Sequence, residues 1–99
     1  MNASNLIKVF ITGHLKDYTG KKREFEISNT KNISSLLGVL ENMFPGIGDR
    51  ILDDQGETRP FVNIFVNGEN IRDGAKENTT LNEGDTVHIL PSVAGGLVA

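Results

Sequence analysis

Residues 81–96 read LNEGDTVHILPSVAGG and join a predicted β-strand to a glycine-rich end. Within residues 86–90 polar and apolar side chains alternate, with Val87 and Ile89 on one side, which is the period of a strand that buries one face. Pro91 has no backbone N–H to donate, so we expect the strand to end before it. The residues that follow are small or apolar and carry no side-chain charge, which is typical of a segment that projects from a domain.

The projecting segment contains two adjacent glycines, Gly95 and Gly96. A carboxyl group on Gly96 would have no side chain beside it and could enter a narrow channel in another protein. From Pro91 to Gly96 the extended chain reaches about 20 Å, which is long enough to cross such a channel. The alternative is a frayed chain end without a function. We therefore predict a domain of residues 1–90 followed by a flexible tail of residues 91–99.

Composition limits the class of protein. The 99 residues fit one domain, and they include no cysteine, so the chain has neither a disulfide nor a thiol nucleophile of its own. The net charge of −3 argues against a nucleic-acid partner. No apolar stretch approaches the ~20 residues of a membrane span, and residues 1–5 lack the character of a signal peptide. We expect a soluble, cytoplasmic protein that binds neither nucleic acid nor membrane.

The rest of the chain predicts strands arranged around one helix. Residues 61–66 carry apolar side chains on both faces, which favours a central strand, and Asn67-Gly68 predicts a type I′ turn after it. This pattern is an α+β architecture in which the helix lies across one face of a sheet. The predicted order is strand 6–12, loop 14–20, strand 22–27, a helix from residue 33, a helical turn over 47–52, loop 53–59, strand 61–66, strand 69–72, loop 72–78 and strand 86–90.

The predicted helix has a start signal, an apolar stripe and a stop signal. Asn32 is the expected N-cap, and Pro45-Gly46 is expected to end the helix. The stripe follows the helical spacing of i, i+3, i+4 and i+7. Its members are Ile33, Leu36, Leu37, Leu40, Met43 and Phe44.

Two stretches together resemble a known family. Residues 81–96 are similar to the end of the MoaD/ThiS-like sulfur-carrier family, which is typified by the small subunit of molybdopterin synthase. Residues 59–72, RPFVNIFVNGENIR, are similar to the central hairpin of its molybdopterin-synthase-like branch. The family also includes the thiamin sulfur carrier, the sulfur carriers of cysteine synthesis and the small archaeal modifier proteins. The resemblance implies a ubiquitin-like β-grasp fold, a mixed sheet of four to five strands with one main helix.

The resemblance also implies a carrier that is acted on rather than an enzyme. In the family, an E1-like adenylyltransferase uses ATP and Mg to activate the terminal carboxyl group, here that of Gly96, and the carrier itself binds no cofactor. A sulfur donor system then produces a thiocarboxylate, or a lysine of a target protein attacks and an isopeptide bond forms. Val93, Ala94 and Gly95 are the expected recognition residues of the tail.

Three further residues, Leu97-Val98-Ala99, keep the carboxyl group of Gly96 in a peptide bond. The working form of the family ends at the second glycine, so we expect residues 97–99 to be removed, by analogy through a JAMM-type zinc metalloprotease. The alternatives are an artificial extension or an inactive relative.

No catalytic or metal-binding set is evident in the sequence. His14 and His88 are far apart and lack a companion at metal-ligand spacing, so both are interpreted as surface histidines. Asp53-Asp54 is interpreted as part of a solvated loop, because no further oxygen ligands follow at the spacing of a calcium loop.

Phe10, Phe65 and Leu90 are predicted to point away from the helix-covered face of the sheet. If the sheet has β-grasp order, their strands are neighbours, and the three side chains form a partner-docking patch beside the root of the tail. The alternative is that they are scattered or covered by a loop. In the resembling family, this face and the tail contact the activating enzyme and the partner subunit.

Three classes of function remain open at this point. The first is a sulfur carrier or protein modifier. The second is the small subunit of molybdopterin synthase, whose tail enters the active site of the large subunit and donates sulfur in molybdenum cofactor biosynthesis. The third is a plain β-grasp interaction domain. Co-purification with a large synthase subunit, adducts on lysines, or a tail that can be deleted without effect would distinguish them.

Overall fold

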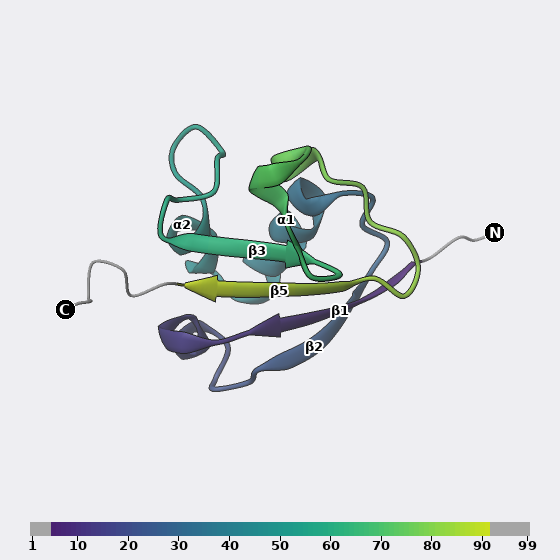
Figure 1. The fold of residues 1–99 in the computed structure, drawn as a ribbon. Helices are drawn as coiled ribbons and strands as arrows, with labels where there is room; N and C mark the ends of the chain where they lie inside the picture. The colour runs from purple at the N-terminus through teal and green to yellow at the C-terminus, as the bar shows by residue number, and fades with distance from the viewer. Residues whose placement is uncertain (1–4, 92–99) are drawn as a thin grey trace.

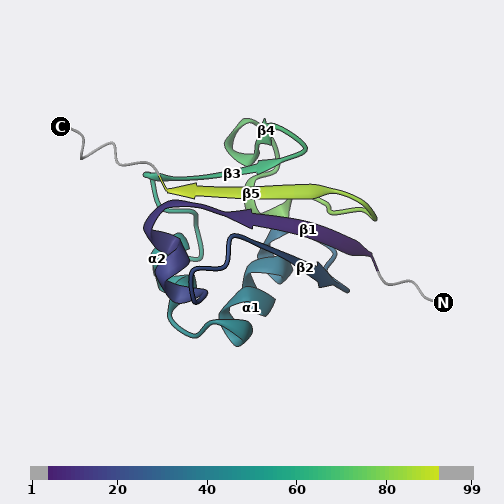
Figure 2. The same ribbon diagram turned by 90° about the horizontal axis from the view of Figure 1, so that it is seen from below.

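The computed structural model describes residues 5–91, and residues 1–4 and 92–99 lie outside the described part. A five-stranded sheet of order β2-β1-β5-β3-β4 forms one layer, and the two α-helices lie on one side of it (Figures 1 and 2). In chain order the elements, with 3-10 helices labelled η, are β1 (Leu6–Ile11), η1 (Gly13–Tyr18), β2 (Glu24–Ser28), α1 (Ile33–Met43), α2 (Ile47–Ile51), β3 (Val62–Val66), β4 (Glu69–Asn70), η2 (Ile71–Asp73), η3 (Lys76–Asn78) and β5 (Thr86–Pro91).

The last strand, β5, occupies the middle of the sheet. It runs parallel to β1 and antiparallel to β3, and β1 in turn pairs antiparallel with β2. The first, third and last strands are therefore neighbours, as predicted. Because β5 holds the middle position, the expectation of a central strand over residues 61–66 is met only in that β3 is an interior strand, between β5 and the two-residue β4. Its outward apolar side chains have another role, described below.

Helix α1 begins where the sequence predicts. The Asn32 side chain accepts a hydrogen bond of 2.8 Å from the backbone N–H of Ser35, and the Ser35 hydroxyl accepts one of 3.2 Å from the backbone N–H of Asn32. This reciprocal capping box satisfies two N–H groups that have no partner within the helix. The predicted stripe is buried from Ile33 to Leu40. Met43, at the last position of the helix, is 44% exposed, whereas Phe44 is half-buried and packs against the core.

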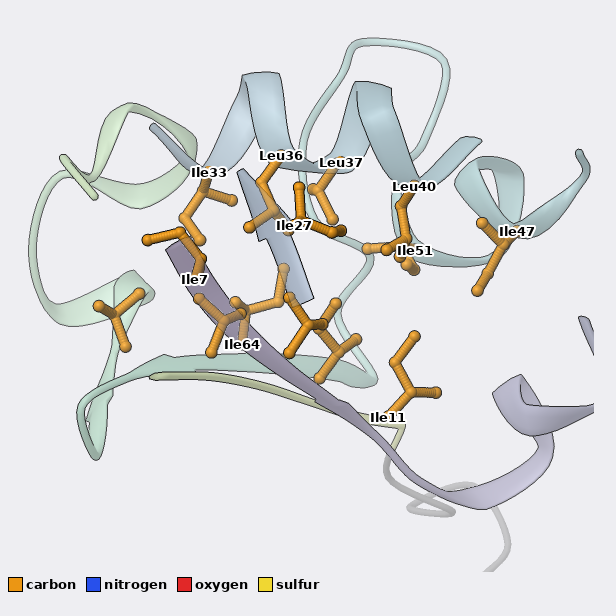
Figure 3. Close-up of a cluster of buried hydrophobic side chains, with 14 of the residues drawn as sticks. Ile7, Ile11, Ile27, Ile33, Leu36, Leu37, Leu40, Ile47, Ile51 and Ile64 are labelled. Carbon is orange, nitrogen blue, oxygen red and sulfur yellow. The ribbon is translucent and has the colours of Figure 1, made fainter. Parts of the chain in front are cut away.

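The core fills the space between α1, α2 and the inner face of the sheet (Figure 3). Strand side chains alternate across the sheet, so that Ile7, Ile64 and Ile89 face the helices and are fully buried. Leu36 and Leu40 of α1 meet them from the other layer and are also fully buried. Burial of each such side chain contributes about 1.5–3 kcal/mol, which makes this face the source of the stability of the domain.

The connections contain more structure than predicted. The loop expected over residues 14–20 is the 3-10 helix η1, which inserts the fully buried Leu15 into the core. The strand expected over residues 69–72 ends at Asn70, because the Asn70 side chain accepts a hydrogen bond from the backbone N–H of Arg72 and starts η2. The turn before it is confirmed as left-handed at both positions, with φ of 52° at Asn67 and 88° at Gly68.

Candidate docking face and tail root

Three residues with ring side chains lie next to one another in register on the three neighbouring strands β1, β5 and β3, at positions that alternate with the buried residues of the inner face. Phe10 of β1 and Phe65 of β3 both pair in register with His88 of β5. The rings of Phe10 and His88 are stacked, with centroids 4.7 Å apart and planes inclined by 10°. All three residues are half-buried, so each keeps part of its surface free for a partner.

Leu90 extends this row toward the end of β5. It lies two residues beyond His88 on the same face of the strand, pairs in register with Asn63 and is half-buried. The structure therefore brings Phe10, Phe65 and Leu90 to one face, as predicted from strand alternation. We call Phe10, Phe65, His88 and Leu90 the docking patch, after the role that is proposed for these residues below.

His88 is the member of the docking patch that the sequence analysis missed. Its interpretation as a surface histidine treated it alone, whereas the sheet register places it between two phenylalanines. The signal was present in the alternation of β5, because His88 shares a face with Leu90 and is separated from it by one inward residue, Ile89. Its imidazole presents an aromatic surface together with a polar edge.

Arg72 holds the polar border of the docking patch in place. Its guanidinium donates hydrogen bonds of 2.7 Å to the Asn63 side-chain oxygen and 2.6 Å to the backbone carbonyl of Arg59. Asn63 is the register partner of Leu90, so this network borders the patch close to the end of β5. It ties η2 to the strand beneath and leaves a polar rim beside an apolar centre, the arrangement found in protein interfaces.

The root of the tail is Pro91, the last described residue, and it is still part of β5, so the strand runs one residue further than the predicted end at residue 90. Pro91 is in register with Val62 of β3, and on its other side it lies against the backbone of Gly13 at the start of η1. The predicted recognition residues Val93, Ala94 and Gly95, the predicted activated residue Gly96, and the extension Leu97–Ala99 all lie outside the described residues.

Neither a metal-binding cluster nor a membrane-spanning helix is found within residues 5–91. No group of three or more His, Asp or Glu side chains in this range could hold a metal ion. None of the helices in the same range has both the length and the apolar character needed to cross a bilayer. Asp53 instead organises its own loop, because its carboxylate accepts hydrogen bonds from the backbone N–H groups of Gln55 and Glu57.

Comparison with known proteins identifies the family. The model of the ThiS family matches residues 9–96, from β1 through the second glycine of the tail. The chain belongs to the ThiS family. The match covers all four residues of the docking patch and the tail as far as Gly96.

Curated relatives of this ThiS-family chain carry the names of sulfur carriers and protein modifiers. The sulfur carrier protein CysO of Mycobacterium tuberculosis is 35% identical over 92 residues, which are 91% of this chain and 98% of the relative. The small archaeal modifier protein 3 of Haloferax volcanii is 30% identical over 82 residues, 82% of this chain and 88% of the relative. The chain is thus a member of a family of sulfur carriers and modifiers.

A solved structure that is similar to this ThiS-family chain confirms the predicted fold. In the crystal structure of the Amycolatopsis orientalis BexX/CysO complex, one chain superposes with a TM-score of 0.83 and 29% identity, covering 91% of this chain and 99% of that chain. The mixed five-stranded sheet with one main helix is the ubiquitin-like β-grasp fold. That solved structure is a complex of a carrier with another protein.

Proposed function

We propose that this chain is a ubiquitin-like sulfur carrier or protein modifier that is activated at the carboxyl group of Gly96. The observation that carries the proposal is the family match through Gly96, on a chain in which two residues of the docking patch, His88 and Leu90, belong to the strand that leads into the tail. Relatives named as a sulfur carrier and as a small archaeal modifier support transfer of sulfur and conjugation, respectively.

Activation has to overcome the poor leaving ability of a carboxylate oxygen. An E1-like adenylyltransferase with ATP and Mg would join AMP to the Gly96 carboxylate and release pyrophosphate, so that AMP becomes the leaving group. A sulfide equivalent from a sulfur donor then displaces AMP and leaves a thiocarboxylate. Alternatively, the amine of a target lysine attacks the same carbonyl carbon, loses a proton and forms an isopeptide bond.

Removal of Leu97-Val98-Ala99 has to precede activation. Hydrolysis of the bond between Gly96 and Leu97 adds one water, places a free carboxyl group on Gly96 and releases a tripeptide. A JAMM-type zinc metalloprotease is the proposed agent.

The docking patch supplies affinity in this scheme, and the tail supplies the reacting group. A partner that covers Phe10, Phe65, His88 and Leu90 buries a compact aromatic and aliphatic centre, the kind of surface on which a few residues carry most of the binding energy. Val93, Ala94 and Gly95 then pass through the channel of the partner, where glycine at position 95 allows a close approach.

Reconstitution with purified proteins tests the proposal. The full chain is incubated with Mg-ATP and the E1-like enzyme of the same organism, before and after treatment with the JAMM-type protease, and pyrophosphate release is measured. We expect release after trimming and none before it. Equal release in both cases would contradict the need for processing, and no release from trimmed chain would contradict the proposed function. A stable complex with a large synthase subunit, without adducts on lysines, would instead favour the small subunit of molybdopterin synthase.

A further inference from the structure

The end of β5 is defined by a backbone hydrogen bond that cannot form. The backbone N–H of Thr12 donates to the carbonyl of Ile89 at 3.3 Å, which continues the parallel ladder between β1 and β5. In a parallel ladder the next bond would run from the N–H of residue 91 to the carbonyl of Thr12. Pro91 has no N–H, so the ladder between β1 and β5 ends there.

The Pro91 ring makes a close contact with Gly13 at the point where that hydrogen bond is missing. Gly13 follows Thr12 and begins η1, and its backbone lies so close to the Pro91 ring that an added Cβ atom would be 2.8 Å from Cγ and 3.4 Å from Cδ. Real Cβ atoms essentially never approach a carbon to 2.8 Å, so a side chain at position 13 would displace the ring. Figure 1 shows η1 and the end of β5 at the same end of the sheet. We call this contact of the Gly13 backbone with the Pro91 ring the root contact.

The opposite side of Pro91 is held by β3. Pro91 pairs in register with Val62, which is 1% exposed, and β3 remains antiparallel to β5 up to that pair. Pro91 also has a φ restricted by its own ring to about −65°. Pro91, at the root of the tail, is therefore held by its covalent geometry, by Val62 on one side and by Gly13 on the other.

We propose that the root contact is a positioning device, in which Gly13 fixes the direction in which the tail leaves the sheet. This inference rests on the proposed function, in which the docking patch and the carboxyl group of Gly96 engage one partner at the same time. The partner holds the sheet face through the docking patch, and the tail has about 20 Å in which to reach the nucleotide. A tail that starts in a fixed direction places the carboxyl group near the phosphorus more often than one that starts in many directions, which raises the turnover rate without changing docking.

A comparison of substitutions at two glycines distinguishes the effect of backbone strain from the effect of contact with Pro91. Gly13 and Gly20 have nearly equal φ values of +68° and +66°, but an added Cβ atom at Gly20 meets nothing within 4 Å. Gly13→Ala and Gly20→Ala therefore share the strain of a left-handed backbone, and the clash with the proline ring belongs to Gly13→Ala alone. Pro91→Ala removes the Cγ and Cδ atoms that a side chain at position 13 would meet.

Thermal unfolding of the full chain tests the root contact itself. We expect Gly13→Ala to lower the Tm more than Gly20→Ala does when Pro91 is present. In the Pro91→Ala background the two changes should lower the Tm equally, because the clash has gone. Two results would overturn the root contact. One is an equal loss of Tm for Gly13→Ala and Gly20→Ala in the chain with Pro91. The other is a larger loss for Gly13→Ala that stays the same in the Pro91→Ala background.

Activation kinetics test the positioning role. The processed forms of the wild type, Gly13→Ala and Gly20→Ala are purified from native cells and supplied to the activating enzyme at equal concentrations of folded protein. We expect Gly13→Ala to lower kcat about tenfold relative to Gly20→Ala, with the same KM, because docking through the patch is intact. Equal kcat values would overturn the positioning role. A wild-type chain that is never activated would overturn the proposed function, and the positioning role with it, whereas the unfolding result would still report on the root contact.

Discussion

At the scale of the residue, Phe65 carries the clearest prediction for docking. It is half-buried on the outer face, pairs in register with His88 and lies apart from the core on the other side of the sheet. Truncation to Ala removes a large part of the apolar centre of the docking patch and leaves the helix-covered face unchanged. We expect Phe65→Ala to weaken binding to the activating enzyme by about tenfold or more, measured by calorimetric titration.

The control for this change is Met43→Ala. Met43 is a large apolar residue that is 44% exposed, but it lies at the end of α1, on the other side of the sheet from the docking patch. Met43→Ala should leave the affinity for the activating enzyme unchanged. Equal affinities for Phe65→Ala and Met43→Ala would show that binding does not use the outer face of the sheet.

Glu41 carries a prediction for the pH dependence of stability. Its carboxylate accepts hydrogen bonds from the backbone N–H groups of Gly46 at 3.0 Å and Gly48 at 2.7 Å, and these bonds lower the pKa of Glu41 below its ordinary value of 4.5. A carboxyl group with a lowered pKa in the folded state stabilises the fold above its unfolded pKa. This contribution is lost as the pH falls from about 4.5 through the folded pKa.

We therefore expect Glu41→Gln to lower the Tm at neutral pH, because the bonds to α2 lose their charge. The difference from the wild type should shrink as the pH falls from about 4.5 through the lowered folded pKa of Glu41, below which the wild-type carboxyl group is also protonated. Glu26→Gln, a change at an exposed position of β2, is the control. A difference for Glu41→Gln that is constant from neutral to acid pH would contradict the role of the charge.

At the scale of the element, the N-cap of α1 makes a testable contribution. Asn32→Ala removes the acceptor for the Ser35 N–H and breaks the capping box. We expect a loss of about 1 kcal/mol in the free energy of unfolding, measured by urea denaturation. Ser34→Ala, an exposed change in the first turn of the same helix, should cost much less. A similar loss for both changes would show that the cap does not stabilise the helix.

The elements also show what could be predicted from the sequence. The strands β1, β2, β3 and β5 and the start of α1 follow from side-chain period and from a capping residue, which are local signals. The 3-10 helix η1 could not be predicted in this way. It is too short to have a period of its own, and it forms because Leu15 fits a space in the core that only the complete sheet creates.

At the scale of the whole molecule, the two faces of one sheet carry different sets of side chains. The inner face packs Ile7, Ile64 and Ile89 against the helices, and the outer face presents the docking patch. Strand alternation predicts both sets, because it assigns every second residue to one face. It does not predict which outward residues become neighbours, since that depends on strand order and register. For this reason Phe10, Phe65 and Leu90 were predicted as a group through a family resemblance, and His88 was missed.

The parallel pairing of β1 with β5 also sets where the tail begins. Both strands end at the same edge of the sheet, so the turn that follows β1 reaches Pro91. The sequence separates Gly13 from Pro91 by most of the length of the chain, and no local pattern predicts that they touch. This long-range contact is therefore visible only in the assembled fold.

The central claim is that Gly96 becomes a free, activated terminus, and the intact mass of the protein from its native cells tests it most directly. The account predicts a chain that ends at Gly96, with one oxygen replaced by sulfur or with the mass of a conjugated target. Processing and activation would then be established in one measurement. A mass that includes Leu97-Val98-Ala99 in every molecule would contradict the account, and a β-grasp interaction domain with an idle tail would become the leading interpretation.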